Sequence, residues 1–127
     1  MKKLILPVLA LLFCSMTSPT DCSRFRNGKF RSSINGAPYF IERKGDFQRE
    51  YVLGSPDSAM LTFHVKWISD CTYTVDPTDE TRKKIPQLPK DAILTSEIIS
   101  TTDSTYTTRS TSNFATLVDT VTFARVN

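Results

Sequence analysis

The sequence is poor in the residues on which most catalytic and metal sites depend. Its 127 residues include one histidine, three cysteines and four glycines. It has no glycine-rich phosphate loop, no nucleophile elbow, no paired zinc-ligand motif and no dinucleotide-binding fingerprint. The sequence therefore predicts no metal, no cofactor and a protein that is not an enzyme.

Long apolar runs are also scarce, and the only one opens the chain. Residues 4–13 are apolar, Lys2 and Lys3 precede them, and small residues follow at 15–18. A run of about ten residues is too short to span a bilayer, which needs about twenty. This order predicts a signal peptide over residues 1–20 and a single domain over residues 21–127.

Cys14 leaves a second form of export open. Bacterial lipoproteins are cleaved immediately before a cysteine that becomes acylated, although Phe13 is larger than the residue such a signal prefers. The alternatives are a soluble protein of the periplasm or medium, and a lipoprotein anchored through Cys14 or Cys22 at the outer-membrane surface. Such an anchor is the only membrane contact that the sequence predicts.

An excess of charge of one sign is missing too. Removing Lys2 and Lys3 from the 16 basic residues leaves 14 against 13 acidic ones, a net charge of about +1. A charge this small predicts no nucleic-acid partner.

Cys22 and Cys71 are the two cysteines that remain after the predicted leader. Two cysteines in an exported chain are typical of a disulfide bond, and we predict one between them. Closing a loop of about fifty residues stabilises a fold by about 4 kcal/mol in the chain-entropy model.

The clearest strand pattern lies in the middle of the chain, at residues 61–67. Apolar side chains at 61, 63, 65 and 67 alternate with polar ones, as in a strand with one buried face. A three-residue loop at 68–70 would place Trp67 opposite Cys71, so that Cys71, Tyr73 and Val75 continue on the inner face.

Further strands flank this central hairpin. Gly45 and Asp46 mark a hairpin between residues 39–43 and 47–52, and a loop is expected at residues 35–38. On that hairpin the charged side chains can pair across the strands: Glu42, Arg43, Arg49 and Glu50.

The second half of the chain contains an exposed loop and more strands. Three prolines interrupt residues 76–89, where one helical turn is expected at 79–84. Residues 92–100 read as a strand with Glu97 pointing out. Of the residues from Thr95 to Ser112, 12 of 18 are Ser or Thr, and Tyr106 among them favours a hairpin strand over a disordered stalk.

Together these patterns predict an all-β domain of seven or eight antiparallel strands in meander order, as a curved sheet or small open barrel. Its core is expected to contain eight side chains: Phe25, Phe30, Phe63, Val65, Trp67, Tyr73, Val121 and Phe123.

Binding is the function class that the sequence leaves open, beside a structural or interaction role in the cell envelope. Four cations crowd residues 24–31 and are interpreted either as an anion-binding patch or as a solvated first strand protected from edge pairing. A small apolar or glycan ligand, or an envelope protein, is the predicted partner. The expected contacts are Arg24, Arg26, Arg31 and Tyr39, which favour an anionic head group.

The alternative is a small hydrolase or isomerase that uses His64 as a general base. It requires a carboxylate such as Glu42, Glu50 or Asp70 beside the imidazole. Thr62 and Lys66 flank His64 at the same strand parity and place it on the wet face.

Several motifs resemble a group of small exported proteins from Bacteroidetes-type bacteria. They are the Cys and Gly-x-Phe at residues 22–30 and the Trp-x-x-Asp-Cys-x-Tyr at residues 67–73. The resemblance covers residues 22–73. It implies export and a lipocalin-like antiparallel meander, and it implies no activity.

The same resemblance implies candidate sites of O-glycosylation. In such bacteria the signal is Asp followed by Ser or Thr and then an apolar residue. Three triplets are similar to it, at residues 57–59, 103–105 and 119–121, and their acceptors would be Ser58, Ser104 and Thr120.

Overall fold

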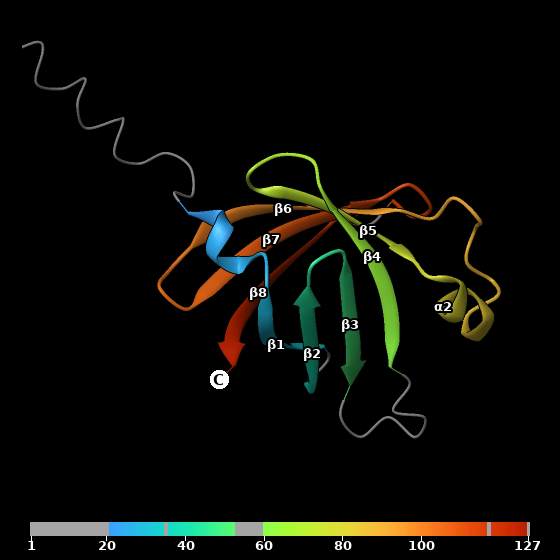
Figure 1. Ribbon diagram of the computed structural model, residues 1–127, viewed down its shortest axis with the longest axis horizontal. Coiled ribbons are helices and arrows are strands. Elements are labelled where there is room, and N and C mark those ends of the chain that lie inside the picture. Colours follow the sequence, from blue (N-terminus) through green and yellow to red (C-terminus); the bar gives the residue numbers. More distant parts are fainter. Residues whose placement is uncertain (1–20, 35, 53–59, 117, 127) are drawn as a thin grey trace, which may run out of the picture.

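The computed structural model describes residues 21–34, 36–52, 60–116 and 118–126. They form eight antiparallel strands, a short 3-10 helix before the first strand and one α-helix between the fifth and sixth (Figure 1). The predicted all-β class is confirmed, and the predicted signal peptide lies outside the described residues. The elements are η1 (Cys22–Phe25), β1 (Gly28–Ile34), β2 (Ala37–Lys44), β3 (Phe47–Val52), β4 (Leu61–Trp67), β5 (Thr72–Pro77), α2 (Asp79–Lys84), β6 (Leu94–Thr101), β7 (Thr105–Ser112) and β8 (Asp119–Val126).

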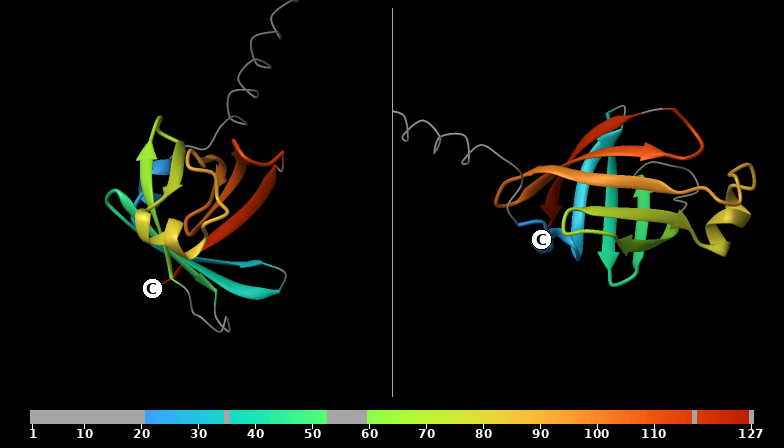
Figure 2. Two further views of the ribbon diagram at one scale, coloured as in Figure 1. Left: turned by 90° about the vertical axis from the view of Figure 1, so that its right-hand side faces the viewer. Right: turned by 90° about the horizontal axis from the view of Figure 1, so that it is seen from above.

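The strands form a closed barrel in meander order. Each strand pairs with its neighbours in sequence, and β1 also pairs with β8 through residues such as Phe30 and Arg125. In Figure 1 strands β1 to β3 run across the direction of β6 and β7, and Figure 2 shows the same sheet from two further sides. The open barrel or curved sheet of the sequence prediction therefore closes fully, and none of these eight strands keeps a free edge.

In the central hairpin the inward-facing side chains are those predicted, but the two strands pair in a different register. Trp67 lies opposite Tyr73, not opposite Cys71 as predicted, so the loop has five residues rather than three. Because both lengths are odd, Tyr73 and Val75 still point inward, and both are buried. The Trp67 and Tyr73 rings pack with their centroids 4.7 Å apart.

The core contains most of the predicted side chains. Five of the eight are buried, namely Phe25, Phe30, Val65, Tyr73 and Phe123. The other three are only partly buried and pack against that cluster: Phe63, Trp67 and Val121.

Two turns show how short polar segments set the register. Gly45 adopts a φ of +61°, and Lys44 lies opposite Phe47, so a two-residue loop joins β2 to β3. Ala37 and Pro38 were expected in a loop but belong to β2, opposite the last residues of β1.

The helical turn predicted at residues 79–84 is α2. The Thr78 hydroxyl accepts the Thr81 backbone N–H at its start. Thr81 then donates its hydroxyl to the Thr62 carbonyl at 2.7 Å and accepts the Thr62 N–H at 2.8 Å. These bonds attach the helix to the beginning of β4.

The Thr-rich segment forms the hairpin β6–β7, as predicted, with a register shift between Ile98 and Ser100. Glu97 is exposed, as expected, and Tyr106 is fully buried. The run of Ser and Thr is therefore strand, and its inward hydroxyls line part of the interior.

Candidate functional site

One end of the barrel is closed by η1, the single turn that precedes the first strand. The first strand, which the sequence suggested within residues 24–31, begins only at Gly28. Phe25 is fully buried, and its ring lies 5.2 Å from that of Tyr106 and 6.2 Å from that of Phe30. The guanidinium of Arg125 lies over both phenylalanine rings, at 5.3 and 5.2 Å. The turn therefore fills this end of the barrel interior, and we call η1, residues Cys22–Phe25, the plug.

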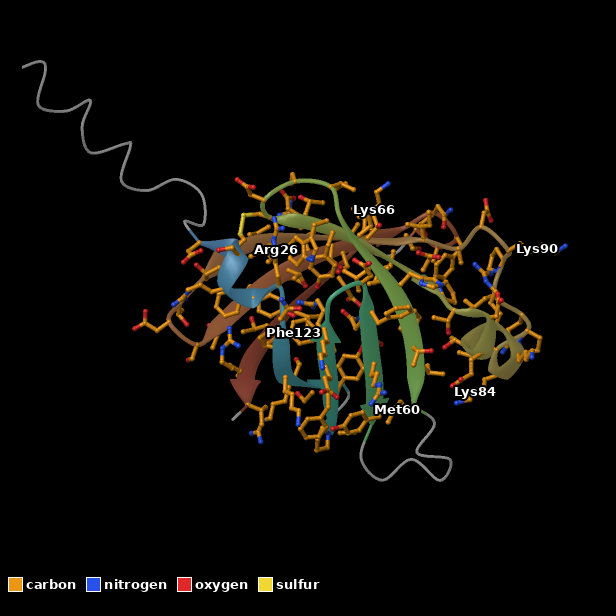
Figure 3. The ribbon with its side chains drawn as sticks, in the orientation of Figure 1. Arg26, Met60, Lys66, Lys84, Lys90 and Phe123 are labelled. Carbon is orange, nitrogen blue, oxygen red and sulfur yellow. A yellow bond between two sulfur atoms is a disulfide. The ribbon has the colours of Figure 1, made fainter. Side chains whose placement is uncertain are left out.

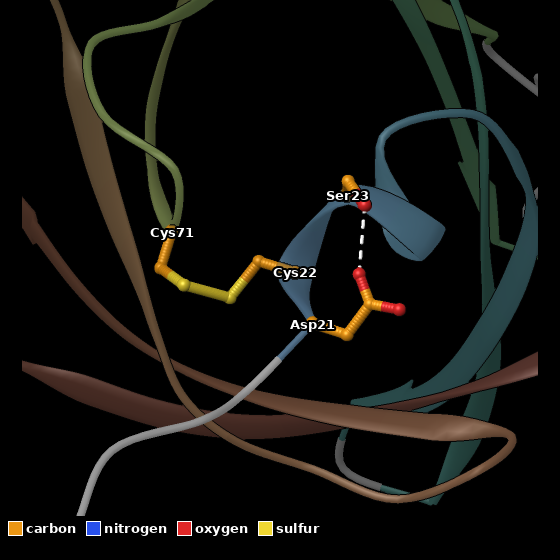
Figure 4. The surroundings of a disulfide bond; sticks show 4 residues. All are labelled: Asp21, Cys22, Ser23 and Cys71. Atoms are coloured by element: carbon orange, nitrogen blue, oxygen red, sulfur yellow. Dashed lines mark hydrogen bonds between the residues drawn. A yellow bond between two sulfur atoms is a disulfide. The ribbon is translucent and has the colours of Figure 1, made fainter.

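A disulfide bond fixes this plug. Cys22, in η1, is joined to Cys71, in the loop between β4 and β5, with their Cα atoms 5.3 Å apart (Figure 4). The predicted pairing is confirmed. Beside it Ser23 donates its hydroxyl to the Asp21 carboxylate at 2.7 Å.

Arg43, which was expected to pair with other charges across its hairpin, occupies the interior next to the plug. Its side chain is almost fully buried. Nη1 donates to the Phe25 carbonyl at 2.6 Å, and Nη2 donates to the hydroxyls of Tyr73 and Tyr106 at 3.2 and 2.9 Å. Nε donates to Gln48 Oε1 at 3.0 Å. Four hydrogen bonds thus compensate for the burial of this charge.

Beyond Arg43, toward the other end, the barrel contains a cavity of about 360 Å³. Its walls are mostly apolar, with hydroxyl groups from β6 and β7 on one side; Ser96 and Ser110 are hydrogen-bonded there at 2.8 Å. Phe123, labelled in Figure 3, lies among the interior side chains. The lining residues are Tyr39, Ile41, Gln48, Glu50, Tyr73, Val75, Leu94, Ser96, Thr108, Ser110, Ser112, Phe114, Ala115, Asp119, Val121 and Phe123.

Glu50 brings a carboxyl group into this cavity. One oxygen accepts the Tyr39 hydroxyl, and the other accepts Gln48 Nε2 at 2.5 Å. Burial raises the pKa of the Glu50 carboxyl, while the two hydrogen bonds and the charge of Arg43 act in the opposite direction. Burial and the neighbouring carboxyl raise the pKa of the Tyr39 phenol, which therefore stays neutral at physiological pH.

Hydrogen bonds connect three polar side chains of the interior in series: Arg43, Gln48 and Glu50. Arg43 Nε can only donate, so it fixes the carbonyl oxygen of the Gln48 amide toward itself. The amide nitrogen must then face Glu50. The interior thus contains one cation and one carboxyl separated by a neutral amide.

The four residues predicted to contact a ligand do not share one surface. Tyr39 lines the cavity. Arg24 donates to the Thr102 carbonyl at 2.6 Å beside the plug, and Arg26 lies over the Trp67 ring at 4.7 Å. Figure 3 places Arg26 at the η1 end of the molecule, and Arg31 is exposed on β1. The arginines therefore stand apart from the cavity.

His64 is exposed on the outer face of β4, next to the ring of Phe47 at 5.3 Å. Glu50, one of its suggested carboxylate partners, faces the interior instead. Among the described residues no ion pair involves His64. The described part of the chain also brings no three metal-ligating side chains together.

A second hollow, of about 530 Å³, lies on the outer face of β2 to β4. Charged side chains such as Glu42, Lys44 and Arg49 line it together with Phe47. Glu42 lies opposite Arg49, as the hairpin pattern predicted. This hollow is lined by several charges of both signs, whereas the interior cavity has mostly apolar walls and one half-buried carboxyl that accepts two hydrogen bonds, so we take the interior as the candidate site.

The candidate glycosylation acceptors have different settings. Ser104 is exposed between β6 and β7, and Thr120 is exposed but lies within β8. Ser58 lies outside the described residues.

Of the cavity residues, Tyr39 was predicted from the sequence as a ligand contact, whereas Gln48 and Glu50 were not. A usable signal existed. With a two-residue turn at Gly45 and Asp46, Arg43 must pair with Gln48 and share its face, and strand alternation then places Glu50 on that face as well.

Comparisons with protein-family models, with curated proteins and with solved structures find no match to this chain. None of the helices in the described residues has the length and apolar character needed to cross a membrane.

Proposed function

We propose that this protein is a non-catalytic binding protein that holds a small, largely apolar ligand in its barrel cavity. The observation that carries the proposal is a cavity of about 360 Å³ behind a plugged end. Small-molecule sites occupy about 300 to 1,000 Å³ and combine apolar walls with a few fixed polar groups. This cavity has both features. Its apolar wall includes Val75, Leu94 and Val121, and its fixed polar groups are those hydrogen-bonded to Glu50.

A purely structural role explains the cavity less well. A barrel that only had to be stable would gain from filling it, because empty apolar volume weakens a core. It would also gain nothing from placing Glu50 where burial raises the pKa of its carboxyl.

The proposal includes export to the cell envelope. The predicted leader at residues 1–20 and the disulfide between Cys22 and Cys71 both support an oxidising compartment. The periplasm, the outer-membrane surface and the medium all meet this condition, and the motif resemblance to exported Bacteroidetes-type proteins favours the same setting. Acyl chains found on Cys14 by mass spectrometry would identify the lipoprotein form, because the sulfur of Cys22 is already bonded to that of Cys71.

The test measures binding of diphenylhexatriene, an uncharged apolar fluorophore, by its fluorescence. Val121→Trp fills the cavity from β8 and should abolish the signal. Thr122→Trp places the same side chain one residue further, on the outer face, and should bind like wild type. Circular dichroism checks that both variants remain folded.

Equal binding by the two tryptophan variants, or no binding by wild type, contradicts a ligand site in the cavity. A structural or partner-binding role would then take its place.

A further inference from the structure

We propose that the ligand carries a protonated amino group, which is held by Glu50 at the inner end of the cavity. The inference rests on the proposed binding function and names the chemistry of the ligand's polar end. It replaces the anionic head group predicted from the arginine-rich segment at residues 24–31, because those arginines lie elsewhere.

The groups around Glu50 leave hydrogen-bond acceptors, and no donors, free for a ligand. The Tyr39 hydroxyl and the Gln48 amide both donate to Glu50, so the carboxylate keeps only acceptor positions free. The Tyr39 hydroxyl uses its hydrogen in that bond, so its oxygen has only acceptor positions left for a ligand. A ligand group that donates several hydrogen bonds fits this pair, and an ammonium group donates three.

The charged side chains that line the cavity are both acidic. Glu50 and Asp119 are the charged residues among its lining side chains, and no described Lys, Arg or His belongs to that lining. Glu50 makes no ion pair within the described chain. A carboxylate in an apolar enclosure with only neutral donors is incompletely compensated, and a cation at contact distance would complete it.

Arg43 does not take this role. Its donors are directed to Phe25, Tyr73, Tyr106 and Gln48, and Gln48 separates it from the carboxylate. A ligand ammonium would touch Glu50 directly while Arg43 stays behind the amide. Because Coulomb energy falls with distance, a ligand charge at this position interacts more strongly with the nearer Glu50 carboxylate than with Arg43. The site should therefore favour a positively charged group.

Binding should depend on pH through Glu50. Of the titratable groups, Tyr39 from β2, Tyr73 from β5 and Asp119 from β8 line the cavity with Glu50, and Arg43 from β2 acts on it through its positive charge; β6 and β7 present apolar and hydroxyl side chains there, and no described residue of β4 lines the cavity. Burial raises the pKa of Glu50, so its negative charge is lost above the usual glutamate range as pH falls. Amine affinity should fall over the same interval.

The experiment compares decylamine, decanol and decanoate, which share one alkyl chain, by displacement of diphenylhexatriene at pH 7.4. For wild type we expect decylamine to bind at least about tenfold more tightly than decanol, with decanoate weakest. Glu50→Gln should remove the preference for the amine, and Glu97→Gln, on the outer face of β6, should keep it.

Two further outcomes decide the inference. Decanol or decanoate binding wild type as tightly as decylamine overturns the amine assignment and leaves the binding function standing. Failure of the fluorophore itself to bind overturns both.

If Glu50→Gln does not fold, Tyr39→Phe provides the second test. It keeps the carboxylate but removes one donor to it, so the pH at which amine affinity falls should move upward. An unchanged pH profile in that variant would contradict the role of the Tyr39 and Glu50 pair.

Discussion

The barrel interior has a half closed by η1, which we call the closed half, and a half that contains the cavity, which we call the open half. The first contains one basic side chain, Arg43, the second contains one acidic side chain, Glu50, and their surroundings differ. Arg43, in the closed half, donates to four neighbouring residues and lies 4.6 Å from the Tyr73 ring. Glu50, in the open half, has two neutral donors and a cavity beside it. The comparison indicates that the first charge holds the structure together, whereas the second is available to a ligand.

The largest expected effect is that of Arg43→Met. The change leaves the Phe25 carbonyl and Gln48 Oε1 without their donor, and it removes the one interior cation that opposes the charge of Glu50. Leaving these two buried acceptors unsatisfied costs about 1 to 3 kcal/mol each, or roughly 2 to 6 kcal/mol together. Urea denaturation should show a loss of this size, and Arg31→Met, on the exposed face of β1, should change stability by less than about 0.5 kcal/mol. A loss below about 1 kcal/mol for Arg43→Met would remove the distinction between the two halves.

The sequence predicted the parts of the fold that depend on local pattern. Four features follow from neighbouring residues or from composition: the alternation at residues 61–67, the Gly45 turn, the helical turn at 79–84 and the pairing of Cys22 with Cys71. Closure of the barrel did not follow, because it depends on pairing of β1 with β8 from the two ends of the domain. Such pairing leaves no local signal.

The site was harder to predict because charged residues in alternating strands are normally read as outward. For that reason Arg43 and Glu50 were grouped with Glu42 and Arg49 as charges that can pair across the hairpin. Only strand parity contradicts this interpretation, and it does so only once the register of the hairpin is known. The η1 plug has no distinctive sequence signal either.

The second prediction concerns the disulfide, which belongs to the closed half alone. Replacing both Cys22 and Cys71 by serine should lower the free energy of unfolding by about 2 to 4 kcal/mol, since the bond closes a loop with a sequence separation of 49. The measurement is urea denaturation, with Ser23→Ala as a mild change in the same turn. Diphenylhexatriene affinity should stay within about threefold of wild type under native conditions. A complete loss of binding in the folded double variant would show that the plug also shapes the cavity.

The smallest effect on the free energy of unfolding is expected from Glu50→Gln. Whether this change stabilises or destabilises the protein is informative. Because the pKa of Glu50 is raised on folding, protonation favours the native state: this contribution is fully present below the unfolded pKa near 4.5 and is lost as pH rises through the folded value. At neutral pH the neutral glutamine should therefore be no worse than wild type, with a difference below about 1 kcal/mol. As the pH falls toward 4.5, any advantage of the variant should disappear, because wild type gains a proton that the variant cannot bind. Glu97→Gln, at an exposed position, should show no such trend.

Urea midpoints measured from pH 8 to pH 4.5 give the comparison directly. A variant that is strongly destabilised at pH 7 would mean that the ionised carboxylate supports the fold as Arg43 does, and the open half would then be structural as well.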